Sequence, residues 1–523
     1  MMPFRVLGWF GFLGFCWSFR PFPQVRQLSL LQHHHRAPFN RVDVLLHAVS
    51  SDVNDGTTMS SIMNGKNVLT GLRVAVVGGG PSGLLLTHRL LKAGASHVSV
   101  FESRPRPSGK LDRRAYALGL GIRGRTAIKS VDEELWEKVK QAGYLSERFH
   151  LHVGPFKITL RSERDGDQMQ NYEPSLLSYQ SELCRVLADQ LEARWSNAEL
   201  QMKFECKVEK VDLLTRTLTT KGTEQYESFD LIVGCDGVKS IVRKSIQSAW
   251  SDFEASAEIL PGEFKVVRLP RMPPLLDPTA VALILPKSGT CTAFVEPTSG
   301  GEGCVLFAGN NATDTLFTSR NATELKLTIE ERFPKLVGGD IDEMVAQLMV
   351  ASNTSKASAV KCSIYHLADV AALVGDAAHA TGGVSGQGVN SALIDAAVLA
   401  DCLIENYDTS SRSASMRKAL LEYSKKQLPE GKALYELSFG PNPSSARKRI
   451  ASTCAKALDF IFKGKFGIGK SPLQTRLTTS LESFADIRRE LDPRYEENFP
   501  SRTEWEEIVS ALDAKAPASL VIK

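Results

Sequence analysis

The chain has 523 residues, of which 43% are hydrophobic and 23% charged, with a formal net charge of +4. This length allows two or three domains, and the composition is that of a globular protein that folds without disulfides or bound metal. The charge balance argues against a general nucleic-acid-binding protein, and the absence of a C-x-x-C pair among nine cysteines argues against a zinc site or a disulfide framework.

The first 42 residues contain five arginines and no acidic residue, and a short apolar run extends from Val6 to Trp17. This run is too short to span a bilayer and is typical of a signal segment. With Phe19 following a cleavage site, the pattern resembles the bipartite presequences of algae with complex plastids. A mitochondrial presequence and a buried N-terminal helix are the alternatives. Residues 43–70 are polar and predict a linker.

The stretch from Leu72 to Glu102 predicts a strand, a glycine-rich turn, a helix and a second strand ending on an acidic residue. Gly78, Gly80 and Gly83 have the spacing that allows a tight turn, close approach of a pyrophosphate, and close packing of helix on strand. The helix N-terminus offers free N–H groups to phosphates, and a carboxylate at Glu102 can bind a ribose. This pattern predicts a dinucleotide site, and a tight turn without a ligand is the alternative.

The next segments alternate between helical and extended patterns. We expect a helix around 127–135, strands at 149–153 and 156–160, a helix at 176–193, and strands at 202–211 and 214–220. A buried strand from Leu231 then runs into Asp236-Gly237, and Ser240 and Arg243 lie on the following helix.

A third strand ends at Gly375-Asp376, in the stretch Ala371–Asp395. Small residues surround Asp376, which suits a carboxylate that binds a ribityl or ribose hydroxyl. Gly386-Gln387-Gly388 then begins a long amphipathic helix. The N-terminus of that helix directs its dipole at any anionic group in front of it.

Three glycine-terminated strands in this order resemble the class A flavoprotein monooxygenases (flavoprotein hydroxylases), and most of all the kynurenine 3-monooxygenases. The resemblance rests on Ala117–Arg125, Leu231–Gly237 and Lys361–Ala380, and covers roughly residues 72–490. It implies an FAD-dependent enzyme that uses NADPH and O2 to oxygenate a small molecule. Because the flavin carries the chemistry, neither a catalytic nucleophile nor a metal site is expected.

The resemblance also implies roles for individual residues. The cofactor-binding residues would be Gly78, Gly80, Gly83, Glu102, Gln180, Asp236, Gly237, Asp376, Gly386, Gly388, Val389 and Asn390. Glu102 would bind the adenosine ribose, Asp236 would serve the second turn, and Asp376 the ribityl chain. Arg148 would bind a substrate carboxylate. An ordinary helix-start role for Gln180 and a solvated surface role for Arg148 are the alternatives.

We therefore predict an α/β, Rossmann-like FAD-binding fold in three layers, with an interleaved mixed β-sheet substrate domain and C-terminal helices. The predicted parts are a presequence (1–42), a linker (43–70), an FAD-binding monooxygenase module (71–405, with a substrate-side sheet inserted at about 251–360) and a helical region (406–523). In the last part, helical patterns cover 418–437, 446–462 and 503–514, and Ser501 with Glu504 predicts a capping box. The basic helix 446–462 suits peripheral contact with an anionic membrane, or a core-facing helix with a solvated basic side.

The loop Gly382–Ser385 departs from the family, which has a proline and aromatic residues there. Two glycines predict a looser wall and argue against kynurenine itself as substrate. The sequence predicts hydroxylation of an aromatic or other electron-rich small molecule, without nucleic acid as a partner. The alternatives are an isoprenoid or quinone epoxidase or hydroxylase at a plastid membrane, and a non-catalytic flavoprotein subunit.

Overall fold

The computed structural model describes residues 67–108, 116–161, 174–222, 225–226, 228–289, 291–309, 314–350, 355–383, 385–440, 473–495 and 497–520. The predicted presequence, most of the linker and the basic helix 446–462 lie outside the described residues.

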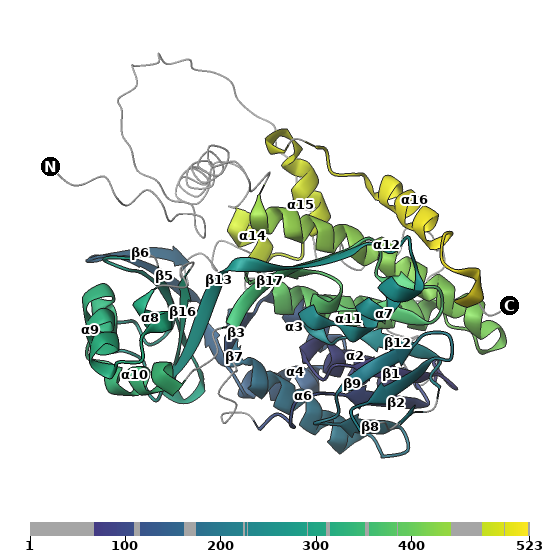
Figure 1. The fold of residues 1–523 in the computed structure, drawn as a ribbon, viewed down its shortest axis with the longest axis horizontal. Coiled ribbons are helices and arrows are strands. Elements are labelled where there is room, and N and C mark those ends of the chain that lie inside the picture. Colours follow the sequence, from purple (N-terminus) through teal and green to yellow (C-terminus); the bar gives the residue numbers. More distant parts are fainter. Residues whose placement is uncertain are drawn as a thin grey trace, which may run out of the picture. The chain divides into compact units, whose positions relative to one another are not determined.

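A six-stranded, mostly parallel sheet forms the centre of the fold (Figure 1). Its strand order is β18 (His366–Leu367), β19 (Ala371–Leu373), β12 (Leu231–Gly234), β1 (Arg73–Val77), β2 (His97–Phe101), β8 (Leu200–Lys203). Only β18 runs antiparallel to its neighbour. The strands β1, β2, β12 and β19 are apolar and almost wholly buried, as expected for a parallel sheet covered on both faces.

Helices and a small sheet cover this central sheet. The helix α2 (Pro81–Lys92) packs against α6 (Gln180–Arg194) and α11 (Gly388–Asn406). A three-stranded sheet comprises β9 (Val208–Asp212), β10 (Thr217–Thr220) and β11 (Gln225–Tyr226), and α7 (Ile241–Ala249) packs on both β9 and β12. The ring of Phe101 on β2 meets the ring of Tyr226 on β11 edge to face, 4.9 Å between centroids. These contacts form the three-layer arrangement that the sequence predicts.

An eight-stranded mixed sheet stands beside this module. Its order is β20 (Ala380–Thr381), β17 (Ser355–Cys362), β13 (Ala255–Leu269), β16 (Gly303–Gly309), β15 (Thr292–Pro297), β14 (Ala280–Leu285), β5 (Arg148–Val153), β6 (Phe156–Arg161). One face of this sheet shares a hydrophobic core with α8 (Thr315–Thr318), α9 (Ala322–Arg332) and α10 (Ile341–Val350), as the left part of Figure 1 shows. The sheet also takes in β5 and β6, which lie well before the predicted insertion at 251–360.

A second three-stranded sheet joins the two larger ones, in the order β3 (Ala117–Leu120), β7 (Ser175–Tyr179), β4 (Tyr144–Ser146). Here the predicted helix 176–193 is wrong at its start, because residues 175–179 pair with β3 and β4 as a strand. The predicted helix around 127–135 is two helices, α3 (Ile122–Lys129) and α4 (Glu133–Gln141). Asp132 caps the second one by accepting a hydrogen bond from Leu135 N, so a new helix begins there.

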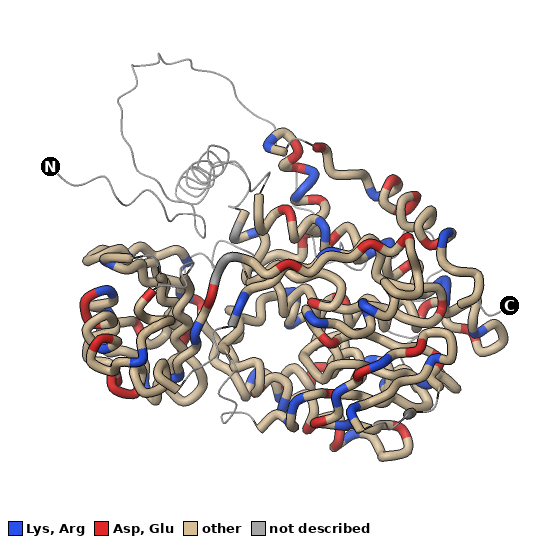
Figure 2. The backbone as a smooth tube through the Cα atoms, viewed as in Figure 1, with Lys and Arg blue, Asp and Glu red and all other residues tan. Residues whose placement is uncertain are grey.

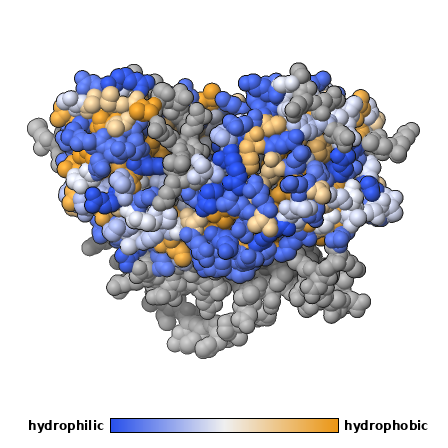
Figure 3. All heavy atoms as spheres, turned by 90° about the horizontal axis from the view of Figure 1, so that it is seen from below, coloured by the Kyte–Doolittle hydropathy of each residue, from blue (hydrophilic) through white to orange (hydrophobic). Residues whose placement is uncertain are grey.

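The C-terminal helices α12 (Arg412–Phe439), α14 (Leu473–Thr479), α15 (Phe484–Glu490) and α16 (Arg502–Asp513) lie on the same side of the module (Figure 1). The predicted capping box of Ser501 and Glu504 is confirmed at the start of α16. Acidic and basic residues are interspersed along the described chain (Figure 2). On the face in Figure 3, apolar residues form small separate groups among hydrophilic ones. Within the described ranges, no helix has the length and apolarity to span a membrane.

Candidate active site

The three glycine-containing turns lie together at one edge of the central sheet. In the strand register, Val77 pairs with Gly234 and Gly234 pairs with Leu373, so β1, β12 and β19 end side by side. Hydrogen bonds continue past the strand ends, from Cys235 N to Val77 O (2.7 Å) and from Val374 N to Gly234 O (3.0 Å). Ligands of open α/β sheets bind outside the carboxyl ends of the strands, and this edge has that position.

The first turn requires glycine at two positions and leaves a third open. Gly78 has φ of +111°, and a Cβ there would lie 2.3 Å from Cys235 O. A Cβ on Gly83 would lie 2.1 Å from Gly78 O. By contrast, a Cβ on Gly80 would meet nothing within 4 Å, and no side chain caps α2 at this residue. The helix N-terminus is therefore open to an incoming anion.

Glu102 follows β2 and folds back onto the glycine turn. Its Oε2 accepts a hydrogen bond from Gly79 N and its Oε1 one from Arg104 N, both at 2.8 Å. The residue is almost fully buried. Its Oε1 also accepts hydrogen bonds from Ser103 Oγ and Arg104 Nε, both at 3.2 Å. An ionised carboxylate has about two acceptor positions on each oxygen, so the position left for the predicted ribose hydroxyl is on Oε2.

Asp236 and Gly237 form the second turn. Asp236 Oδ2 accepts a hydrogen bond from Ile241 N at 2.6 Å, which fixes the start of α7, while Oδ1 is buried without a partner among the described residues. Burial raises the pKa of Asp236. Gly237 has φ of +72° and open space around its Cα. Arg243 Nη1 donates to Ala377 O at 2.8 Å, joining this turn to the third one.

The third turn carries an acidic side chain next to Tyr116. Asp376 is exposed, yet its surroundings desolvate the carboxylate and raise its pKa. Tyr116 shows the same combination, because 40% of its surface is exposed while burial and the nearby charge of Asp376 raise its pKa to about 12. The two side chains are therefore neighbours, and the charged form of each is disfavoured by desolvation.

A buried ion pair anchors this third turn. His379 Nε2 lies 2.7 Å from Asp395 Oδ2, and the same oxygen accepts a hydrogen bond from Gly375 N at 3.0 Å. Burial alone would lower the pKa of His379, but the charge of Asp395 and its hydrogen bond outweigh burial and raise the pKa. Tyr365 stacks on the His379 ring with 5.5 Å between centroids. These contacts hold the backbone that carries Asp376.

The N-terminus of α11 is the second open helix end at the site. A Cβ on Gly386 or Gly388 would meet no atom within 4 Å, although Gly386 has φ of +67°, which favours glycine. The helix α11 has neither a side-chain cap nor an acid in its first turn. Val389 is half-buried. Asn390 faces the protein, because its Oδ1 accepts from Gly121 N (2.9 Å) and its Nδ2 donates to Gly119 O (3.0 Å). Asn390 thus fixes the β3–α3 turn against α11.

That turn contains a second G-x-G-x-x-G, Gly119, Gly121 and Gly124, which the sequence reading missed. The Asn390 amide oxygen also accepts from Gly124 N at 3.3 Å, so the turn N–H groups are engaged by a side chain of the protein. The strand before it belongs to an antiparallel sheet. This glycine pattern serves packing, and it shows why flanking structure decides the meaning of such a motif.

The other predicted positions differ in their surroundings. Gln180 is half-buried at the first residue of α6, and its N–H donates to Tyr116 O at 3.1 Å. Arg148 begins β5 and lies on Asp277, with Nη1 3.4 Å from Oδ2. The structure therefore gives Arg148 an acidic partner within the protein.

The glycine loop after the third turn is more constrained than the sequence predicts. Gly382 and Gly383 have φ of +59° and +77°, which favour glycine. A Cβ on Gly382 would lie 2.4 Å from Leu260 Cδ1, so that residue is closely packed against β13, and only Gly383 has open space.

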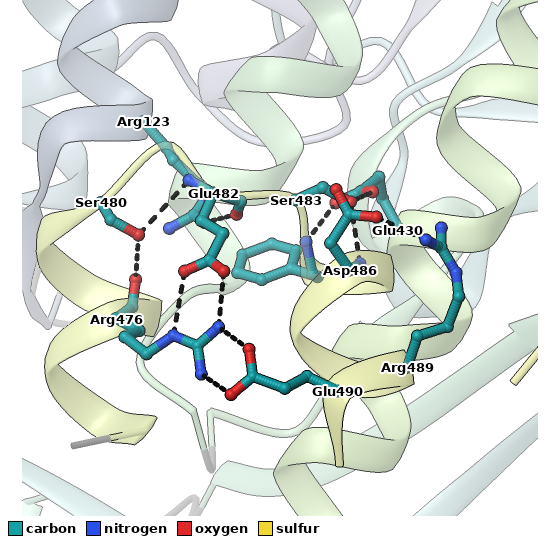
Figure 4. A network of polar contacts seen from close by, with 10 residues as sticks. Arg123, Glu430, Arg476, Ser480, Glu482, Ser483, Asp486, Arg489 and Glu490 are labelled. Atoms are coloured by element: carbon teal, nitrogen blue, oxygen red, sulfur yellow. Dashed lines mark hydrogen bonds and ion pairs between the residues drawn. The ribbon is translucent and has the colours of Figure 1, made fainter. Parts of the chain in front are cut away.

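Polar contacts connect the C-terminal helices with α3 and α12, which only the structure reveals (Figure 4). Arg123 on α3 donates from Nη1 to Leu477 O at 2.6 Å, and its guanidinium lies 4.0 Å from the centre of the Phe484 ring. Arg476 binds Glu482 and Glu490 together. Phe484 N donates to Glu430 Oε2 at 2.7 Å. These contacts attach α14 and α15 to α3 and α12.

The residues at this edge fit a dinucleotide cofactor such as FAD. Two uncapped helix N-termini, open glycine positions and the Asp376 carboxylate can provide phosphate and hydroxyl contacts at this edge. Residues 71–438 match a protein family described as an FAD binding domain. The chain belongs to this family.

Two named relatives specify the class further. The kynurenine 3-monooxygenase of Flavobacterium psychrophilum is 25% identical over 424 residues, covering 79% of this chain and 90% of the relative. That of Salinispora tropica is 29% identical over 406 residues, covering 72% and 81%. The fold resembles the tetrameric form of 2-methyl-3-hydroxypyridine-5-carboxylic acid oxygenase, with a TM-score of 0.57 and 19% identity over 83% of this chain and 100% of the other. The protein is an FAD-dependent monooxygenase similar to kynurenine 3-monooxygenases.

Proposed function

We propose that the enzyme takes electrons from NADPH and hydroxylates an aromatic or other electron-rich small molecule with O2. Bound FAD supplies the redox chemistry and the reaction with oxygen. The observation that carries the proposal is the meeting of three glycine-containing turns at one edge of the central sheet, together with the uncapped N-termini of α2 and α11. This edge would hold the cofactor.

The chain's own residues would bind and orient the cofactor. Gly80 and the first turn of α2 would face the diphosphate, Glu102 the adenosine ribose and Asp376 the ribityl chain. The open N-terminus of α11, at Gly388 and Val389, would favour negative charge on the reduced ring. The ion pair of His379 and Asp395 would keep Asp376 in position without contacting the cofactor.

The test begins with the purified full chain. We expect a yellow protein whose bound flavin is reduced by NADPH without oxygen, more slowly by NADH. A panel of phenols, anilines, quinones and isoprenoids is then screened for accelerated NADPH loss, and products are analysed for an oxygen atom from labelled O2. Bound flavin that NADPH does not reduce would refute the proposal that NADPH is the electron donor. Reduction without any oxygenated product across the panel would favour a non-catalytic flavoprotein.

We also propose plastid targeting by the N-terminal segment, on the basis of its arginine-rich, acid-free sequence. Fusion of residues 1–70 to a fluorescent protein in an alga with complex plastids tests this. Plastid fluorescence is expected, and mitochondrial fluorescence would favour the alternative presequence.

A further inference from the structure

The eight-stranded sheet has one face that is not covered by helices α8–α10. On β13, β15 and β16, fully buried residues that face those helices alternate with half-buried residues on the opposite side. We call the opposite side the inner face, and its residues include Phe149, Leu283, Phe294, Glu296, Cys304 and Leu306. Paired residues of neighbouring strands lie on the same side of a sheet. The rings of Phe149 and Phe294 confirm this, since they meet edge to face at 5.8 Å.

The inner face adjoins the cofactor module. Cys304 packs with Ala117 of β3 and Tyr179 of β7, which are the strands leading to α3 and α6. Tyr116 precedes Ala117 and lies close enough to Asp376 for the charge of that carboxylate to raise the pKa of the tyrosine. Glu296 is also near enough to contribute to the raised pKa of Tyr116. The inner face therefore lies next to the third turn of the cofactor edge.

Glu296 is the unusual residue on this mostly apolar face. Only 7% of its surface is exposed, and its carboxylate has no hydrogen-bond or ion-pair partner among the described residues. Desolvation raises the pKa of Glu296 to about 7. An unpartnered buried carboxylate costs stability, so a group that arrives with a ligand would relieve this cost.

We propose that Glu296 accepts a hydrogen bond from a hydroxyl or amino group of an aromatic substrate, and so selects donor-bearing rings over carboxylate-bearing ones. This inference rests on the proposed function and names the substrate class of the same site. Phe149, Phe294 and Leu306 provide the apolar surface for the ring.

The other charges near this face agree with that selection. A carboxylate only accepts hydrogen bonds when ionised, and it repels a second carboxylate in a dry site. Arg268 lies on the same face, but its guanidinium is stacked 4.1 Å from the centre of the Tyr179 ring. Arg148, the predicted carboxylate-binding residue, is paired with Asp277. Glu296 thus places a hydrogen-bond acceptor beside the ring-binding surface, while the guanidinium of Arg268 lies against Tyr179.

The test compares 4-methylphenol, 4-methylaniline and 4-methylbenzoate, which share one methylphenyl body. Their dissociation constants are measured from the absorbance change of the protein-bound flavin, at mildly alkaline pH where Glu296 is ionised. The FAD-loaded full chain is used as wild type, Glu296→Gln and Glu296→Leu. The control is Glu331→Gln, the same chemical change at an exposed position on α9, behind the sheet. This readout needs no turnover.

We expect the wild type and Glu331→Gln to prefer the phenol and the aniline over the benzoate by about tenfold or more. Both Glu296 variants should lose most of that preference while retaining FAD. The inference is overturned if the preference survives in Glu296→Gln, if the wild type prefers the benzoate, or if no donor probe binds. It is also overturned if both Glu296 variants lose FAD, because Glu296 would then support the fold. Failure of the proposed function would appear separately, as flavin that NADPH does not reduce.

Discussion

Alanine substitutions at Gly80 and Gly83 should separate the ligand contact of the first turn from its packing. At Gly83 a methyl group would lie 2.1 Å from the carbonyl oxygen of Gly78, and backbone cannot rotate away as a side chain could. Overpacking costs about 1–3 kcal/mol, and we expect the upper end. Alanine recovers about 1 kcal/mol of helix propensity. The net expectation is that Gly83→Ala destabilises the apoprotein by about 2 kcal/mol.

At Gly80 the same methyl group would meet no atom within 4 Å. Its φ of −76° is accessible to alanine, but Gly80 is the N-cap of α2 and alanine is a poorer N-cap residue than glycine, so we expect a loss of about 0.5–1 kcal/mol, below that of Gly83→Ala. The methyl would instead stand where a diphosphate approaches the start of α2. We therefore expect Gly80→Ala to weaken FAD binding by about tenfold or more.

Urea unfolding of the apoproteins gives the two stabilities, and quenching of flavin fluorescence gives the two FAD affinities. The reasoning would be refuted by a Gly83→Ala apoprotein as stable as wild type. Equal destabilisation of the apoprotein by Gly80→Ala would also refute it, because the open space at Gly80 would then not make the substitution less costly than at Gly83. Unchanged FAD affinity in Gly80→Ala would show that the diphosphate does not bind at this turn.

Three further predictions concern the contacts around the site. Asp395 raises the pKa of His379 above its ordinary value of 6.5, so protonated His379 stabilises the folded protein. This contribution to the free energy of unfolding should be fully present below pH 6.5 and lost as the pH rises through the raised pKa. His379→Gln should abolish this pH dependence, and urea midpoints that coincide for the two proteins at every pH would contradict it. Asn390→Ala removes the acceptor of Gly121 N and should lower the free energy of unfolding by about 1–3 kcal/mol. Asn406→Ala on the same helix loses one hydrogen bond to Cys402 O and should lower it by less in the same unfolding assay. Arg476→Ala should lower the free energy of unfolding by only about 1–3 kcal/mol, because the side chains of its partners Glu482 and Glu490 are 34% and 35% exposed. The variant should also be cleaved faster by proteases in the C-terminal helices. Unchanged cleavage would show that this arginine does not hold those helices in place.

Local patterns in the sequence predicted the parts of the fold that depend on near neighbours in the chain. The apolar run before Gly78 and the helical pattern after it form β1 and α2 as expected. The capping box at Ser501 needs only two residues of one helix turn, and it is present. The error at 176–179 arose because four apolar and small residues suit a buried strand as well as a helix. Pairing with β3, more than fifty residues earlier in the chain, decides for the strand.

The site was only partly accessible to the same reasoning. Gly80, Asp236 and Asp376 could be proposed because each follows a strand and carries its own turn chemistry. Glu296 could not be proposed as a site residue, because an acid within an apolar strand looks the same in sequence whether it faces solvent or the protein interior. The glycine patterns that begin at Gly78 and at Gly119 have the same spacing, so spacing alone does not tell which of them binds a ligand. The side chain of Asn390 distinguishes them, because it accepts hydrogen bonds from Gly121 N and Gly124 N in the second pattern.

The amino-acid sequence by itself determined the three strand-turn units, because backbone preference and hydrophobic periodicity act within a few residues. The family and the cofactor followed from the resemblance of these units to those of flavoprotein monooxygenases. Tertiary structure decided that the three turns meet at one edge, that Asp395 and His379 anchor the third turn, and that Glu296 is buried without a partner. Those outcomes depend on register between strands and on desolvation, both of which are set by residues far away along the chain.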